Sequence, residues 1–198
     1  MQTNKSKRMS TERLVLGALM TALVVVFQCL ATYTAFFGPF STAIGLIPIV
    51  IGAVLCGPGI GAWLGLVFGI VVLATGGANL FLAFSVPGTV ITVLGKGMAC
   101  GFASGWVNKL LSRLNKSVAS IAAALTGPIV NTGVFLLGCW IFFMPHASAI
   151  AEQVGNDKSG FAVFVALAMV NFLIEVGMNV VLTPVFHTVY RVAEKKRR

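Results

Sequence analysis

The chain has 198 residues, of which 58% are hydrophobic and 10% are charged, and its formal net charge is +9 at pH 7. A mean hydropathy of +0.96 excludes an ordinary soluble domain and indicates an integral membrane protein. This length has room for about six helices of the roughly 20 residues that cross a bilayer. We therefore expect one membrane domain over residues 1–198 and no separate soluble domain.

Apolar stretches along the chain predict the spanning elements. No period-two alternation typical of barrel strands occurs, and only helices or closed barrels satisfy the backbone in lipid. The expected helices cover residues 12–31, 43–56, 59–75, 86–107, 117–143 and 161–189. The predicted fold is an all-α membrane protein, a compact bundle of six transmembrane helices.

The basic residues predict how this bundle lies in the membrane. Of the 14 lysines and arginines, twelve fall in residues 1–13, in the connection 108–116 and in residues 190–198. All three groups lie on one side of a six-span bundle, and the positive-inside rule makes that side cytoplasmic. We therefore expect a multi-pass plasma-membrane protein with cytoplasmic termini at 1–11 and 190–198. Topology and anionic lipid headgroups explain the charge, so no nucleic-acid partner is expected.

Small residues recur at helical spacing in three of the expected spans. Ala18 and Ala22 form such a pair in the first span, although this pattern is common in apolar helices. Glycines repeat every four residues in the third and fourth spans, a pattern that lets two helix backbones approach closely. These glycines are Gly61, Gly65 and Gly69, followed by Gly97, Gly101 and Gly105.

Two connections on the outer side are candidate gates over a ligand. Residues 32–42 are uncharged and aromatic, which suits an apolar lid. Its rings include Tyr33, Phe36 and Phe37, and the alternative is an interfacial aromatic belt. The other connection contains Asn79 after two glycines, which are either hinges or a simple turn.

Lys96 lies in the middle of the fourth apolar span. A charge at the bilayer centre costs roughly 2.5 to 3.5 kcal/mol, so such residues usually face a cavity and mark a function. Glu175 is the other ionisable residue at this depth. Thr92 shares a helix face with Lys96, Asn171 shares one with Glu175, and Asn131 lies mid-span in the fifth helix. The sequence therefore predicts a polar cavity between these helices.

An alternative interpretation needs no ligand. The asparagines would then hydrogen-bond between helices, and Lys96 and Glu175 would form a buried ion pair. We favour a binding function because a scaffold packs well enough with glycine and alanine. Trp63 is the tryptophan expected to line a pocket, since the other two fall near span ends, where interfacial anchors are typical.

Metal, cofactor and enzyme chemistry find little support. The four cysteines are predicted to be packing residues, and neither they nor the two histidines show metal-ligand spacing, so we expect no metal or cofactor. A membrane-embedded enzyme with Glu175 as general base and His187 as its partner is a lower-ranked alternative, because a converging acid, base and nucleophile are lacking. A purely structural membrane subunit is the third class.

Several segments resemble the substrate-binding S-components of energy-coupling factor (ECF) vitamin transporters. They are RLVLGALMTA (13–22), FFGPF (36–40) and IPIVIGAVLCGPGIGA (47–62), and the similarity covers nearly the whole chain. The resemblance implies a protein that captures a vitamin outside the cell and delivers it by toppling in the membrane. It also implies that Ala18 and Ala22 dock on a transmembrane coupling subunit driven by two ATPase subunits. The absence of a Walker-type motif agrees with this division.

The side chains favour an anionic vitamin. Lys96 is a natural counter-charge for a carboxylate or phosphate, and the amides and Thr92 can bind amides and hydroxyls. Pantothenate matches this set, and PIVNTG (128–133) is most similar to pantothenate-type S-components. If Glu175 neutralises Lys96, riboflavin or thiamine becomes the alternative. The residues expected to bind substrate are Lys96, Asn131, Asn79, Asn171, Glu175, Thr92, Trp63, Tyr33, Phe36 and Phe37.

Overall fold

The computed structural model describes residues 11–34, 41–155 and 160–195, with side chains at 11, 13–32, 45–155 and 160–179. Every regular element in these ranges is a helix, which confirms the all-α class. The helices are α1 (Thr11–Thr34), α2 (Ser41–Cys56), α3 (Pro58–Ala74), α4 (Asn79–Leu82), α5 (Val86–Leu111), α6 (Lys116–Gly138), the π-helix Cys139–Phe143, the 3-10 turn Met144–His146, α7 (Ala147–Gln153) and α8 (Phe161–Lys195).

The six long helices coincide with the six predicted spans, whereas α4 and α7 lie in connections for which no helix was predicted. Four segments are long and apolar enough to cross a membrane, which supports a multi-pass membrane protein. They are Arg13–Thr32, Val86–Leu111, Lys116–Gln153 and Phe161–Asn179. Helices α2 and α3 are apolar but shorter, with 16 and 17 residues. A count of six crossings therefore stays a prediction.

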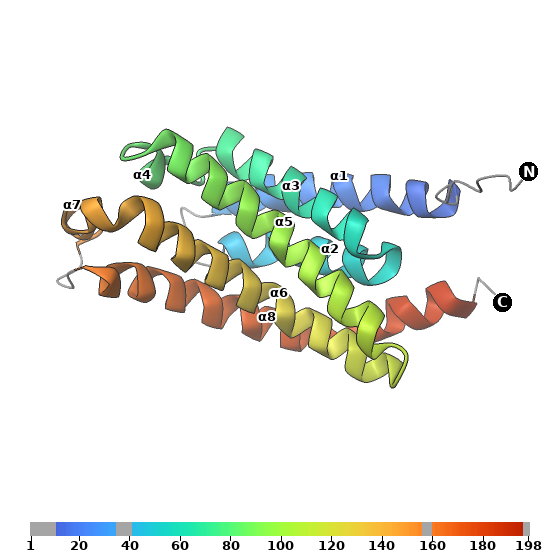
Figure 1. Cartoon of the computed structure of the whole chain (residues 1–198). Helices are drawn as coiled ribbons and strands as arrows, with labels where there is room; N and C mark the ends of the chain where they lie inside the picture. The colour runs from blue at the N-terminus through green and yellow to red at the C-terminus, as the bar shows by residue number, and fades with distance from the viewer. Residues whose placement is uncertain (1–10, 35–40, 156–159, 196–198) are drawn as a thin grey trace, which may run out of the picture.

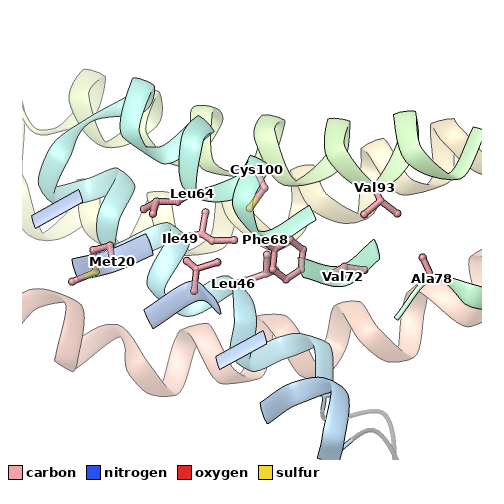
Figure 2. Close-up of a cluster of buried hydrophobic side chains, with 10 residues drawn as sticks. Met20, Leu46, Ile49, Leu64, Phe68, Val72, Ala78, Val93 and Cys100 are labelled. Atoms are coloured by element: carbon pink, nitrogen blue, oxygen red, sulfur yellow. The ribbon is translucent and has the colours of Figure 1, made fainter. Parts of the chain in front are cut away.

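Helix α2 forms the centre of the bundle. It contacts α1, α3, α5, α6 and α8, and most of its described side chains are buried. A helix that is covered on nearly all sides is apolar all round, as this one is. Figure 2 shows its Leu46 and Ile49 beside Leu64 and Phe68 of α3 and Cys100 of α5, in one buried cluster.

Glycines bring α3 and α5 into backbone contact. A Cβ added at Gly65 would collide with the carbonyl oxygen of Gly97, and one added at Gly101 would collide with that of Gly61. A Cβ at Gly105 would lie 2.7 Å from the Cα of Pro58. This confirms the packing interpretation of the glycine repeats, because close approach of two helices requires that neither carries a side chain there.

Side-chain caps define the first residues of α5 and α6. The Ser85 hydroxyl accepts a hydrogen bond from the Gly88 N–H at 3.3 Å at the start of α5. The Asn115 side chain accepts from the Ser117 and Val118 N–H groups at 2.9 and 3.3 Å at the start of α6. Such caps satisfy amides that have no partner within the helix, and they set its first residue.

The helices run lengthwise in the bundle, so their ends gather at two opposite sides. Figure 1 shows the start of α1, the end of α8 and the α2–α3 and α5–α6 connections at one end, with α4 and α7 at the other. The predicted basic connection therefore lies at the same end as the described ends of the first and last helices. Its assignment to the cytoplasm stays a prediction from the charge pattern.

Candidate functional site

A buried carboxylate connects α6 to α8. The Asn131 amide donates to both oxygens of Glu175 at 3.2 Å, and the Asn171 amide donates to one of them at 3.2 Å. Glu175 is 1% exposed and Asn131 is 3% exposed. Hydrogen bonds to an ionised group in a buried site are stronger than those between neutral groups, so they hold this carboxylate in place.

The polar stripe of α8 continues one turn beyond Glu175. The Asn179 amide donates to the backbone oxygen of Glu175 at 2.8 Å, and Asn179 is fully buried. Residues four apart lie on the same face of a helix, which is why Asn171 and Asn179 flank the carboxylate. This face points inward, since α8 packs against α2 and α6.

Lys96 of α5 approaches the same region but has a different partner. Its ammonium nitrogen lies 5.3 Å from the ring centroid of Phe135 in α6, a cation–π arrangement. Lys96 and Glu175 attract each other electrostatically. Among the described residues, however, no hydrogen bond or close ion pair to the ammonium occurs, so the buried ion pair of the alternative interpretation is not formed here.

Two further polar atoms on α5 and α6 have unused hydrogen-bonding capacity. The Thr92 hydroxyl and the Asn131 side-chain oxygen are buried and lack a partner within the part of the chain that the structure describes. Thr92 lies one turn before Lys96 and packs against Gly138 of α6. Because buried polar atoms are normally paired, this cluster has one cation and two oxygens available for hydrogen bonds to a bound molecule.

Aromatic rings adjoin the polar cluster toward the end formed by α4 and α7. Phe81 of α4 makes an edge-to-face contact with Phe135, with centroids 5.5 Å apart, and another with Phe143 at 5.1 Å. These rings belong to a hydrophobic cluster that joins α4, the π-helix, α7 and α8. The sequence interpretation did not select Phe135, although its position one turn after Asn131 places it on the same helix face.

Two predicted site residues lie elsewhere, and the side chains of three others are outside the described residues. Trp63 is 54% exposed, and its indole N–H donates to the Thr21 hydroxyl of α1 at 3.3 Å, on the outside of the bundle. Asn79 is exposed at the start of α4. Tyr33 lies in the last turn of α1, but its side chain lies outside the described residues, as do Phe36 and Phe37.

The structure thus brings together five of the predicted residues and separates two. Lys96, Thr92, Asn131, Asn171 and Glu175 form one polar cluster between α5, α6 and α8. Trp63 and Asn79 are not part of it.

A second polar cluster at the α1–α3 contact was not predicted. Gln28 is 2% exposed, and its amide donates to the Thr32 hydroxyl at 3.5 Å. That hydroxyl lies 3.0 Å from the hydroxyl of Thr75 at the end of α3. The signal was present in the sequence, because Gln28 is an amide within the first apolar run.

The small-residue pair of α1 lies on the surface of the bundle. Ala18 and Ala22 are exposed, and so are Val15, Leu19 and Val26 on the same face. Neither alanine is therefore needed for packing inside the bundle. This face is open to lipid or to another membrane helix.

Metal ligands do not gather in the described ranges. No group of three or more histidine, cysteine, aspartate or glutamate side chains there is arranged to hold an ion. None of the four cysteines, all within the described ranges, forms a disulfide, and Cys56, Cys100 and Cys139 are buried. The chemistry of the polar cluster is therefore that of amides, hydroxyls and two charges.

Comparison with known protein families identifies a match. The sequence model of a protein family described as "ECF transporter, substrate-specific component" matches residues 12–186. No curated protein and no solved structure matches the chain. The matched range contains both the polar cluster of α5, α6 and α8 and the exposed alanine face of α1.

Proposed function

Because the chain belongs to the family of ECF transporter substrate-specific components, we propose that it captures an anionic vitamin, with pantothenate the favoured ligand. Membership by itself makes the chain the substrate-specific membrane subunit of an ECF transporter, hence a transporter component and not an enzyme. It also implies a coupling module with ATPase subunits as the partner. The vitamin and the residues that bind it are the proposal.

The observation that supports an anionic ligand is the difference between the surroundings of the two charges in the cluster. The Glu175 carboxylate accepts three hydrogen bonds from Asn131 and Asn171. The Lys96 ammonium lies over the face of Phe135 and has no hydrogen bond or ion pair among the described residues. The positive charge is therefore the one left to bind a ligand, and it would form a charge-assisted hydrogen bond with a carboxylate or phosphate.

The neighbouring polar atoms favour a ligand with donors close to its anionic group. The free oxygens of Asn131 and Thr92 are acceptors, and a hydroxyl can also donate. Pantothenate carries one carboxylate, one amide and two hydroxyls, so it can engage both the cation and these acceptors. The aliphatic remainder would contact the apolar side chains around the cluster.

A second candidate is riboflavin, and one observation favours it. Phe81, Phe135 and Phe143 place three rings in contact beside the polar cluster, and aromatic faces suit a flat ligand. Thiamine ranks lower, because its cation would need Glu175, whose oxygens already accept amide hydrogen bonds.

Delivery of the vitamin is proposed to use the exposed face of α1. Ala18 and Ala22 are small and lie at the surface, so a helix of the coupling subunit could pack closely against them. In this proposal, the loaded protein topples in the membrane while docked through that face. Binding and delivery then depend on different helices.

Calorimetry on the purified protein tests the ligand. We expect tight pantothenate binding that Lys96→Ala weakens by roughly 1.5 to 3 kcal/mol, the contribution of a charged hydrogen bond. Lys109→Ala, which changes an exposed lysine in the last turn of the same helix, is the matched control. Pantothenol, which has an alcohol in place of the carboxylate, should bind weakly to both proteins.

Other results would change the proposal in defined ways. Tight binding of riboflavin, thiamine, biotin or folate instead would keep the transport function and replace the ligand. Pantothenate binding that is unaffected by Lys96→Ala would remove Lys96 from the site. If none of these vitamins binds, capture of any of them by this chain is ruled out.

A further inference from the structure

The ring of Phe135 makes a cation–π contact with the Lys96 ammonium, with 5.3 Å between the nitrogen and the ring centroid. The ring also packs against Phe81 in an edge-to-face contact, with centroids 5.5 Å apart and the ring planes nearly perpendicular. Phe81 in turn packs edge-on against the buried Phe143 at 5.1 Å. The aromatic face offered to Lys96 is therefore fixed by packing.

One face of α6 contacts both charges of the cluster. Asn131 binds the Glu175 carboxylate, and Phe135, one turn later, contacts the Lys96 ammonium. The two charges attract each other, yet each contacts a different side chain of α6. This arrangement keeps opposite charges apart within one cluster.

Without such a contact, the lysine would be expected to move to the carboxylate. Opposite charges attract strongly where water is excluded, and a lysine side chain has four flexible carbons with which to reach. A buried ion pair would then compete with any incoming anion, because breaking it leaves a charge unpaired. A cation–π contact competes less with the anion, since it leaves all three N–H donors of the ammonium group unused.

We propose that Phe135 is a positioning residue that keeps the Lys96 ammonium away from Glu175 and available for the anionic group of the substrate. The role of the substrate in this inference rests on the proposed function, whereas the separation of the two charges does not. Phe135 acts here through Lys96 and needs no contact with the ligand.

The ligand-free protein tests the separation directly. In lipid bilayers, solid-state NMR with 15N-lysine and 13C-glutamate measures the dipolar coupling between the Lys96 amine nitrogen and the Glu175 carboxyl carbon, with Lys96→Gln identifying the signal. We expect no strong coupling in the unchanged protein or in Phe135→Trp, which keeps an aromatic face. A strong coupling should appear in Phe135→Leu. If that variant does not fold, Phe135→Met, which has no ring and a flexible side chain that can fill the space left by the ring, replaces it.

Phe142→Leu is the matched control, because Phe142 belongs to the same hydrophobic cluster but packs against Gly88. It should leave the Lys96–Glu175 coupling weak. A strong coupling in the unchanged protein, or none in Phe135→Leu and Phe135→Met, would overturn the inference.

Pantothenate binding tests the consequence for recognition. Phe135→Leu should weaken binding at least about tenfold, and Glu175→Gln in the same protein should restore most of it, because the competing ion pair is gone. Pantothenol affinity should not change. Equal losses for both ligands without rescue would show a packing role only and refute the proposal. If the unchanged protein binds no pantothenate, the proposed function fails while the NMR measurement still decides the role of Phe135.

Discussion

At the level of single residues, the Asn131 amide is predicted to stabilise the fold through Glu175. It supplies two of the three hydrogen bonds to that buried carboxylate. Asn131→Leu should therefore lower the free energy of unfolding by about 1 to 3 kcal/mol, the cost of leaving a buried group underpaired. Unfolding in one detergent, followed by circular dichroism, measures this loss.

A double-mutant cycle distinguishes this pairing from general packing. With Glu175→Met already in place, no carboxylate remains to be satisfied, so Asn131→Leu should cost much less. An equal loss in both backgrounds would mean that the amide contributes nothing through Glu175.

The residues of one helix face were predictable, but their partners were not. Spacing by four placed Asn171 with Glu175, and Thr92 with Lys96, because 3.6 residues make one turn. Spacing does not show which neighbouring helix a face meets. The contact of Lys96 with Phe135, instead of with Glu175, could therefore be seen only in the structure. Trp63 lies in a helix that is apolar all round, and such a pattern does not distinguish the lipid-facing side from the inner side.

At the level of helices, the contact between α3 and α5 is predicted to tolerate no side chain at Gly97. A Cβ there would collide with the carbonyl oxygen of Gly65 and force the two backbones apart. Gly97→Ala should lower the free energy of unfolding by about 1 to 3 kcal/mol, the usual cost of overpacking. Thermal unfolding of the purified variant measures this change.

Gly95→Ala is the control within the same helix. Nothing lies within 4 Å of a Cβ added at Gly95, so the substitution should be neutral or stabilising by up to about 1 kcal/mol from helix propensity. If the two variants lose stability equally, the close approach of α3 and α5 would not explain the glycine repeat.

The long helices could be predicted because each needs an apolar run of nearly the same length. Their observed ends differ from the expected ones by a few residues, as in α5, which continues from the predicted Val107 to Leu111. The short helices could not be predicted in the same way. The four residues of α4 and the seven of α7 are too few to show a helical period.

At the level of the whole molecule, the two ends of the bundle are predicted to face opposite sides of the membrane. Leu114 is 86% exposed in the α5–α6 connection, and Glu152 is exposed in α7 at the other end (Figure 1). In a Cys29→Ser background, a membrane-impermeant maleimide added to intact cells should label Glu152→Cys and leave Leu114→Cys unlabelled. Permeabilised cells should label both, and the opposite pattern would refute the cytoplasmic assignment of the termini.

The division of labour between the inner cluster and the outer face of α1 gives the last prediction. The polar cluster lies between α5, α6 and α8, whereas Ala18 and Ala22 lie exposed on α1. A tryptophan at either alanine adds bulk where a coupling helix would pack, without reaching the cluster. Ala18→Trp or Ala22→Trp should therefore abolish vitamin uptake by cells that contain the coupling module and leave the affinity of the purified protein unchanged.

Leu173→Trp is the control for this experiment, because Leu173 is 63% exposed on α8 and carries no small-residue pattern. It should preserve both uptake and binding, which separates a blocked docking face from the general effect of a new tryptophan in the bilayer. Uptake that survives at both alanine positions would remove α1 from the docking surface. A loss of affinity in the purified variants would instead show that α1 supports the binding site, so that capture and delivery share a helix.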